Sequence, residues 1–294
     1  MSPEAALVLC RFARFAAAAL LWGAAAYLAV LVPRPLAAPL WQRLRPAIVA
    51  AVVVVAVAAL AAVPVEAARI GDGWVDAFDY ETLSGVLFST TVGQALLVQA
   101  AAALALLLAL MLRARAQIVA VAAGAGITLA ASALTGHAVM QDGTLGLAHR
   151  LIDAIHILCA GAWVGALVPL ALLLGYFADA ERRVYAALSL RRFSNAGQVV
   201  VTLIILSGIA NTWLLLRQAP LDWSSPYQAL LAIKIALVAV MVAVASANRY
   251  AFSPAISAEP EDALRALRQG TIVELALGTV VLALVAAFGT LDPM

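Results

Sequence analysis

Charged residues are scarce in this chain. Asp, Glu, Lys and Arg make up 12% of its 294 residues, against roughly 25% in an ordinary soluble domain. Hydrophobic residues make up 65%, and the mean hydropathy is +1.03. This composition excludes a soluble domain and indicates an integral membrane protein.

Cysteine and recognisable catalytic motifs are also lacking. Cys10 and Cys159 lie in apolar stretches without a motif partner, so they predict no disulfide framework. We interpret both as small buried hydrophobes. The sequence contains no P-loop and no segment long enough for a soluble catalytic domain. We therefore expect neither an ATPase nor another enzyme, and no nucleic-acid partner.

The apolar residues occur in blocks about as long as the ~20 residues that cross a bilayer. They predict an all-α transmembrane bundle of about eight spans. The connections between blocks are too short for a further domain, so residues 1–294 are expected to form one. The predicted spans are residues 5–32, 46–64, 84–112, 117–138, 147–174, 194–217, 227–250 and 268–290.

The distribution of positive charge predicts an orientation. Twelve arginines fall in the connections after spans 1, 3, 5 and 7, whereas Arg69, Arg150 and Arg217 are the three that follow spans 2, 4 and 6. The positive-inside rule places the arginine-rich connections in the cytoplasm. Both termini then lie outside, which is the periplasm for a bacterial inner membrane. We interpret the acidic connection 66–81 as a hydrated periplasmic loop.

The three histidines, His137, His149 and His156, fall within twenty residues, where spans 4 and 5 meet. Imidazole inside a membrane is costly and marks a ligand site or a pathway. It is also a common ligand of copper, zinc and iron. His149 and His156 are two helical turns apart, so they share one face of span 5, with Asp153 between them.

A separation of about 10 Å along one helix prevents His149 and His156 from binding one ion together, because metal–imidazole bonds are ~2 Å long. The two are either successive stations, or each pairs with another helix, for which His137 is the natural candidate. Met140 and Cys159 could add soft sulfur suited to copper(I). Asp153 could orient an imidazole by accepting its hydrogen bond.

The alternative interpretation is structural: the histidines are interior polar residues that hydrogen-bond between helices. It is stronger for His149, which lies near the interface, than for the deeper His156.

Other polar residues fall within the predicted spans, and their role stays open: Arg11, Arg14, Asn211, Lys234 and Glu274. Charged groups in a membrane should pair or face water. Asp153 is a better-placed partner for Lys234, Arg11 or Arg14 than Glu274 is for Lys234, because Lys234 and Glu274 enter from opposite faces. Cations near the histidines would repel copper and would suit an anion, such as a haem propionate or a lipid phosphate.

At these residues the chain resembles the copper-resistance protein D (CopD/PcoD) family of bacterial inner-membrane proteins, over about residues 80–290 well and over the first two spans loosely. The matching stretches are Leu134-Thr-Gly-His137-Ala, Asp153-Ala-Ile-His156 through Trp163-Val-Gly165-Ala-Leu, Arg192-Phe-Ser194, Leu206-Ser-Gly208 with Asn211, Lys234, Asn248-Arg249-Tyr250 with Pro254, and Glu274.

The resemblance implies a copper-homeostasis protein of the inner membrane, thought to move copper across it, often beside a periplasmic copper-binding partner. It makes His137 and His156 the positions most expected to matter, and His149 less so. Between its ends the chain holds three methionines, Met111, Met140 and Met241, so we expect no methionine relay across the bilayer.

These observations predict a permease that takes periplasmic copper, as Cu(I) or Cu(II), inward past His137 and His149 to His156. Binding should weaken below about pH 6, where imidazole becomes protonated. One alternative is a membrane b-type cytochrome with haem iron between histidines of adjacent helices, for which His137 and His156 match poorly in depth. Another is a non-transporting copper sensor or assembly partner.

Overall fold

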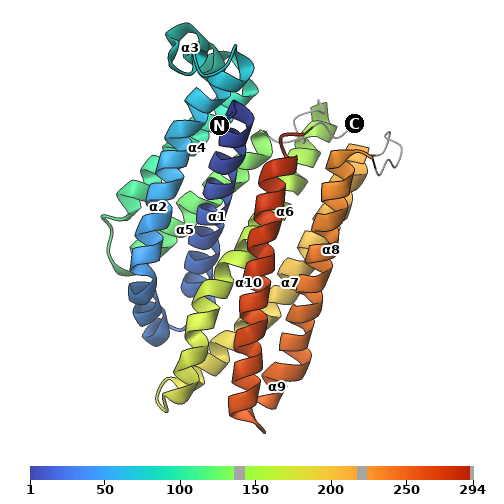
Figure 1. The fold of residues 1–294 in the computed structure, drawn as a ribbon. Helices are drawn as coiled ribbons and strands as arrows, with labels where there is room; N and C mark the ends of the chain where they lie inside the picture. The colour runs from blue at the N-terminus through green and yellow to red at the C-terminus, as the bar shows by residue number, and fades with distance from the viewer. Residues whose placement is uncertain (136–142, 217–223, 292–294) are drawn as a thin grey trace.

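The computed structural model describes residues 1–135, 143–216 and 224–291. Over these residues the chain is almost entirely helical and contains no strand. Eight helical segments are long and apolar enough to cross a membrane, which confirms the predicted fold class. Figure 1 shows them as one bundle, in which the start of the first helix and the end of the last lie at the same end.

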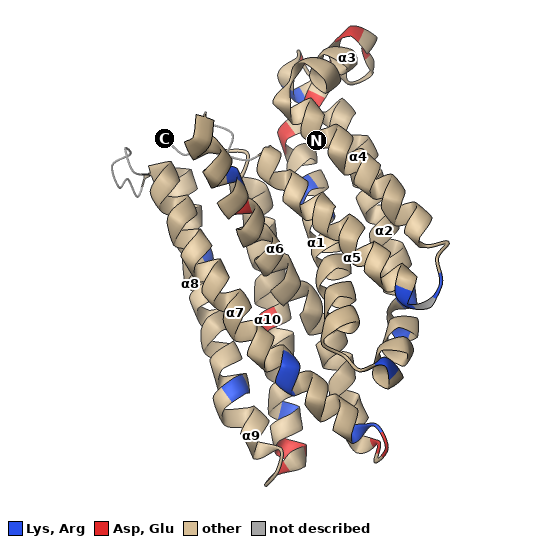
Figure 2. Cartoon of the chain, turned by 180° about the vertical axis from the view of Figure 1, so that it is seen from behind, with Lys and Arg blue, Asp and Glu red and all other residues tan. Residues whose placement is uncertain are grey.

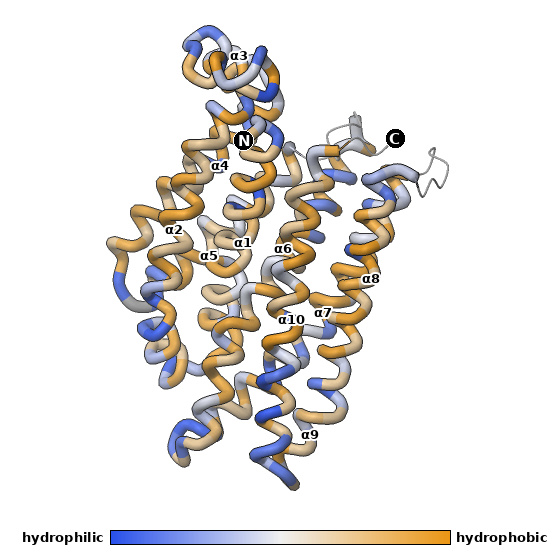
Figure 3. Tube along the Cα trace, viewed as in Figure 1, coloured by the Kyte–Doolittle hydropathy of each residue, from blue (hydrophilic) through white to orange (hydrophobic). Residues whose placement is uncertain are grey.

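The eight spans are formed by α1 (Pro3–Val30), α2 (Arg34–Ile70), α4 (Thr91–Ala109), α5 (Ala114–Ala130), α6 (Gly143–Leu173), α7 (Arg183–Leu216), α8 (Pro226–Ala247) and α10 (Pro260–Phe288). The shorter elements are η1 (Asp76–Phe78), α3 (Tyr80–Ser89), η2 (Ala131–Leu134), η4 (Leu174–Ala178), the π-helical turn η5 (Asn248–Phe252) and α9 (Ser253–Ala255). Apolar residues dominate the middle of the spans, and polar residues gather at their ends (Figure 3).

Several helices extend beyond their predicted bounds. Helix α2 begins at Arg34 instead of residue 46, α7 begins at Arg183 instead of 194, and α10 begins at Pro260 instead of 268. Hydropathy marks only the stretch that would lie in lipid, whereas a helix continues for as long as its backbone hydrogen bonds do. The arginines assigned to the first cytoplasmic loop therefore lie on the opening turns of α2.

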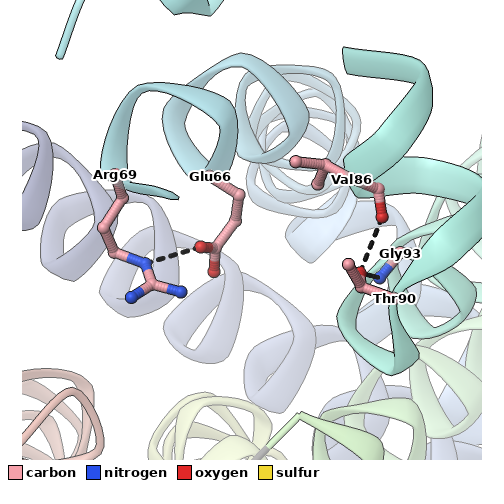
Figure 4. Close-up of polar contacts among 5 residues, drawn as sticks. All are labelled: Glu66, Arg69, Val86, Thr90 and Gly93. Carbon is pink, nitrogen blue, oxygen red and sulfur yellow. Dashed lines mark hydrogen bonds and ion pairs between the residues drawn. The ribbon is translucent and has the colours of Figure 1, made fainter. Parts of the chain in front are cut away.

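The predicted span 84–112 is divided into two helices at Thr90, which has extended backbone angles. The Thr90 hydroxyl donates to the Val86 carbonyl (2.6 Å) and accepts from the Gly93 amide (2.9 Å), as Figure 4 shows. One side chain thus donates to a carbonyl in the last turn of α3 and caps the first turn of α4. Because the chain turns here, α4 alone forms the span.

The acidic connection 66–81 is also more ordered than a hydrated loop. Glu66 lies in the last turn of α2, is only 8% exposed, and forms an ion pair with Arg69 at 2.6 Å (Figure 4). The expectation of an open acidic loop was therefore wrong at Glu66. It holds better for the residues after Gly71, where the helix ends.

Helices α1 and α6 cross closely because small residues line their contact. A Cβ atom on Gly165 would collide with the Ala19 carbonyl oxygen, and one on Gly23 would lie 2.6 Å from the Ala166 nitrogen. Small residues spaced four apart let two membrane helices approach backbone to backbone. Helix α1 also packs on α2, α5 and α10, so this crossing joins the two halves of the bundle.

Charged residues lie mainly at the two ends of the bundle (Figure 2). Lys and Arg are more numerous toward the end opposite α3, and acidic residues are prominent around α3. The few charged groups between these ends are therefore the ones that need a specific explanation.

Candidate functional site

A cavity of about 190 Å³ lies among α1, α6, α7, α8 and α10. Its wall is mostly apolar. Its polar lining residues are Arg11, Ser132, His149, Asp153, His156, Asn211, Thr212, Tyr227 and Lys234. The cavity thus gathers most of the intramembrane polar residues that the sequence singles out, at the end of the bundle where the first helix begins.

His156 is oriented by α7. Its Nδ1 atom lies 3.1 Å from the Ile204 carbonyl oxygen and 3.0 Å from the Ser207 hydroxyl. A carbonyl can only accept, and the Ser207 hydroxyl already donates to the Leu203 carbonyl, so we assign the ring hydrogen to Nδ1. The lone pair is then on Nε2, the arrangement typical of a histidine whose free nitrogen binds a metal.

The sequence suggested Asp153 as the acceptor that orients an imidazole. For His156 the acceptor is the Ile204 carbonyl. The Asp153 carboxylate instead accepts a hydrogen bond from Asn211 Nδ2 at 3.0 Å, which links α6 to α7. Ser207 falls within the Leu206-Ser-Gly208 stretch already singled out, whereas Ile204 acts through its backbone and leaves no mark in the sequence.

His149 lies on the same cavity wall and is 3% exposed. Its Nδ1 atom is buried and has no hydrogen-bond partner among the described residues. A buried ring nitrogen without a partner is costly, and native proteins usually satisfy it with water, an ion or a ligand. The structural interpretation, which required a hydrogen bond between helices, therefore finds no support at Nδ1 of this histidine.

Two cations line the cavity but do not pair with Asp153. No ion pair within 4.0 Å joins Asp153 to Lys234 or Arg11 in the described part of the chain. The Lys234 ammonium lies 5.8 Å from the centre of the Phe288 ring. Among the described residues, Asp153 therefore forms no direct ion pair with Lys234, Arg11 or Arg14, the partners that the sequence suggested.

Arg14 lies one turn beyond Arg11 on α1 and is 5% exposed. The two guanidinium groups each lie 5.8 Å from the centre of the Phe15 ring. The Nε atoms of both arginines are buried and have no hydrogen-bond partner among the described residues. Arg14 does not line the cavity, so among the residues that the structure describes Arg11 and Lys234 are the cations that a bound ion would meet there.

Cys159, the candidate sulfur ligand that the structure describes, does not line this cavity. Cys159 packs against the apolar core, and Cys10 packs against Ala6, Leu7 and Val65. His137 and Met140 lie outside the described residues. Within the described residues no group of three or more His, Cys, Asp or Glu side chains could hold a metal ion. His149, Asp153 and His156 line one cavity, and these three described side chains do not form a metal-holding group by themselves.

Glu274 belongs to a different cluster. Its Oε2 atom accepts from Trp163 Nε1 (2.9 Å) and its Oε1 atom from Asn248 Nδ2 (2.8 Å). It is 3% exposed, and no described ion pair joins it to Lys234. The expectation that these two charges do not meet is thus in keeping with the structure.

The fold and the cavity define a class: a multi-pass helical membrane protein with imidazole and carboxylate groups in a cavity within the bundle. Two family models match the chain, "Copper resistance protein D-like, N-terminal domain" over residues 1–147 and "Copper resistance protein D" over residues 187–288. The chain therefore belongs to the copper resistance protein D family. The N-terminal match includes the first two spans, where the sequence motifs gave only a loose resemblance.

Individual relatives agree with this assignment. The chain is 31% identical over 283 residues to the inner membrane protein YebZ of Escherichia coli (strain K12), covering 96% of this chain and 97% of that protein. It is 37% identical over 175 residues to copper resistance protein D of Pseudomonas syringae pv. tomato, covering 57% of this chain and 56% of that relative.

A third relative is the copper transport protein CutJ of Bacillus subtilis (strain 168), 27% identical over 210 residues, which cover 68% of this chain and 38% of CutJ. The chain thus spans nearly all of YebZ, about half of the Pseudomonas protein and less than half of CutJ. No solved structure gives a significant match.

Proposed function

We propose that this chain carries copper from the periplasm across the bacterial inner membrane, through the cavity of His149 and His156. The observation that carries the proposal is the hydrogen bond from His156 Nδ1 to the Ile204 carbonyl, which leaves Nε2 free as a ligand. The family and the printed name of one relative, a copper transport protein, support copper as the ion.

The donor set suits an ion in transit. Imidazole nitrogen is a good ligand for copper, and the Asp153 carboxylate adds negative charge beside it. A transport site must bind firmly enough for entry and weakly enough for release. We infer that His149 and His156 act as successive stations, because two helical turns separate them. His137 remains our candidate for the cross-helix partner, with Met140 as a soft ligand beside it.

Lys234 and Arg11 limit the affinity of this site. From the described lining residues, a bound copper ion would share a low-dielectric cavity with two positive charges and one carboxylate. Their repulsion opposes a long-lived complex and favours release toward the next station. This is a consequence expected of a permease, whereas a storage site would be surrounded by carboxylates or thiolates.

We infer the orientation of the protein from its charge distribution and from the position of the cavity. The arginine-rich end of the bundle is placed in the cytoplasm by the positive-inside rule. The cavity lies toward the other end, beside the first turns of α6 and α8 and the last turns of α7 and α10. Periplasmic copper would therefore reach the histidines first, and a periplasmic copper-binding protein is our candidate for its donor.

The test is copper uptake into proteoliposomes that contain a copper-sensitive dye. We expect uptake by the wild-type protein and its loss in His156→Ala. Ile155→Ala is the matched control, because Ile155 is the adjacent residue on α6 and is exposed on the outer surface of the bundle. Wild-type liposomes that take up no more copper than protein-free ones would contradict transport and favour a sensor or an assembly partner.

A further inference from the structure

A second polar cluster lies deeper in the bundle, where α6, α10 and the turn η5 meet. Its centre is the buried carboxylate of Glu274, whose two oxygens accept hydrogen bonds from Trp163 and Asn248. Both donors are neutral. No Lys or Arg lies within 4.0 Å of this carboxylate in the described part of the chain. Glu274 is therefore a buried acid without a direct counter-ion.

Such a group is expensive when ionised, because a low-dielectric interior penalises an unpaired charge. Binding a proton removes the charge and with it most of that cost. The surroundings must then satisfy the group in both states, which means donors for the carboxylate and an acceptor for the hydroxyl of the acid. This requirement can be checked against the residues that surround Glu274.

Asn248 meets the requirement. Its Nδ2 atom donates to Glu274 Oε1, while its Oδ1 atom is buried and has no partner among the described residues. If the amide turns over, Oδ1 becomes an acceptor for a hydroxyl on Oε1. Trp163 can only donate, so it stays with Oε2 and directs the proton to Oε1. Gly270 leaves the space, since a Cβ atom there would collide with the Asn248 amide.

The surrounding charge favours a proton over a metal ion. A cavity of about 50 Å³ beside Glu274 is lined by Asn248, Arg249, Ser194, Ser253 and Thr271 among others. Among its described lining residues Arg249 is the only other charged one, and the remaining lining groups from α7, α9 and α10 are neutral. Its charge repels a metal cation, yet it helps the carboxylate to exist after the proton leaves.

Arg249 also marks a route to the surface. It donates hydrogen bonds to Ser194 and to the exposed Asn195 at the α7 end of the same cluster. Asn248 and Arg249 are both placed by a π-helical turn, an irregularity frequently found at functional sites. A proton on Glu274 therefore has a polar path toward the arginine-rich end of the bundle.

Helix α6 connects this cluster to the copper cavity. Trp163 lies two turns beyond His156 on the same face of α6. A shift of α6 that accompanies copper binding at His156 would move the Trp163 indole relative to Glu274. The hydrogen bond between them would then be stronger in one position of α6 than in the other.

We propose that Glu274 takes up and releases a proton in each cycle of copper movement, exchanging it through the Arg249 cavity. The proton adds to Oε1 of the carboxylate and returns to solvent, and no electron is transferred. This inference rests on the proposed function, since it names the ion that is coupled to copper.

The experiment measures copper and internal pH together in proteoliposomes, for the wild type, Glu274→Gln and the control Glu261→Gln, an exposed acid on the same helix. We expect a copper-linked pH change in the wild type and in the control, and its loss in Glu274→Gln. Equilibrium copper binding in detergent should be the same in all three. A copper-linked pH change that persists in Glu274→Gln would overturn the proposal.

Two further outcomes separate this proposal from the proposed function. Wild-type copper uptake without any pH change, or with dependence on a sodium gradient, would overturn proton coupling and leave copper transport intact. Absence of uptake in the wild type would contradict transport itself.

In that case infrared spectra of the carboxylic acid band, with and without copper, still test Glu274. If copper induces no such band in the wild type, or if the induced band persists in Glu274→Gln, protonation of Glu274 is overturned. If Glu274→Gln misfolds, Glu274→Asp replaces it in the comparison, because aspartate keeps the acid.

Discussion

At His156 a single backbone carbonyl decides which ring nitrogen is free. The Ile204 oxygen accepts from Nδ1, so the imidazole presents Nε2 with its lone pair. Ser207 reinforces this arrangement from one turn further along α7. The proposed metal-binding role of His156 therefore depends on the position of α7 as much as on the histidine itself.

Ser207→Ala should weaken copper binding without abolishing it. The Ile204 carbonyl still holds the tautomer, so we expect a loss of on the order of tenfold, the lower end for residues that orient a metal-binding histidine. Copper titration of the purified protein against a competing chelator measures the change. Ser246→Ala is the control, because the Ser246 hydroxyl donates to the Val242 carbonyl on its own helix. Unchanged affinity in Ser207→Ala would show that Ser207 does not contribute.

Lys234→Met should tighten copper binding. Lys234 is the only lysine of the chain and lines the cavity, where its charge opposes a cation. For charges about 10 Å apart at an effective dielectric constant of about 20, the repulsion is ~1–2 kcal/mol, or on the order of tenfold in affinity. The same chelator titration checks this, with Lys234→Arg keeping wild-type affinity. Weaker binding in Lys234→Met would mean that the lysine holds the site together.

At the residue scale, the side chains that share one helix face were predictable from their spacing in the sequence. The stripe of His149, Asp153 and His156 lines one cavity, as helical periodicity required. The partners of these residues were not predictable. Asp153 was expected to meet an imidazole or a cation, but it binds Asn211, because its neighbours depend on how α7 lies against α6.

Among the elements, α6 organises both polar clusters. It carries the histidines at one end and Trp163 further along, and it is held against α1 through the contact of Ala19 and Gly23 with Gly165. The Trp22 indole adds a hydrogen bond to the Leu158 carbonyl at 2.9 Å. The position of the cavity therefore depends on a crossing that only small residues permit.

Gly165→Val should destabilise the protein. The added side chain would collide with the Ala19 backbone, and overpacking of this kind costs ~1–3 kcal/mol. Thermal unfolding in detergent should show a clearly lower midpoint. Gly197→Val is the matched control, because nothing lies within 4 Å of the Cβ position at this helical glycine. Equal midpoints for the two variants would contradict a tight α1–α6 contact.

The number of spans was predicted correctly and their ends were not. Apolar blocks identify what can enter a bilayer, so all eight spans were found. The ends of α2, α7 and α10 lie in polar sequence, where capping and neighbouring helices decide how far the helix continues. The break at Thr90 was missed for a similar reason, since a threonine cap inside an apolar run leaves hydropathy almost unchanged.

For the whole molecule, the two polar clusters lie at different depths of one bundle. The histidine cavity lies toward the end at which α1 begins, and the Glu274 cluster lies further toward the arginine-rich end. In the proposed cycle copper enters at the first cluster, and the proton of Glu274 exchanges nearer the arginine-rich end. This order gives the proposed transport a direction only if the arginine-rich end faces the cytoplasm.

Reporter fusions at the C-terminus test that orientation. Both termini are predicted in the periplasm, because the spans are even in number and the arginines follow the odd ones. We expect alkaline phosphatase fused to the C-terminus to be active. Green fluorescent protein fused at the same position should not fluoresce. The opposite pattern would reverse the membrane orientation and place the histidine cavity toward the cytoplasm.

The most direct measurement of the central claim is the copper and iron content per chain of detergent-purified wild type and His156→Ala. The account predicts near-stoichiometric copper in the wild type and a clear loss in the variant. Iron with a haem Soret band and no copper would contradict it in favour of a b-type cytochrome. Copper that is equal in both proteins would show that the His156 imidazole is not a ligand.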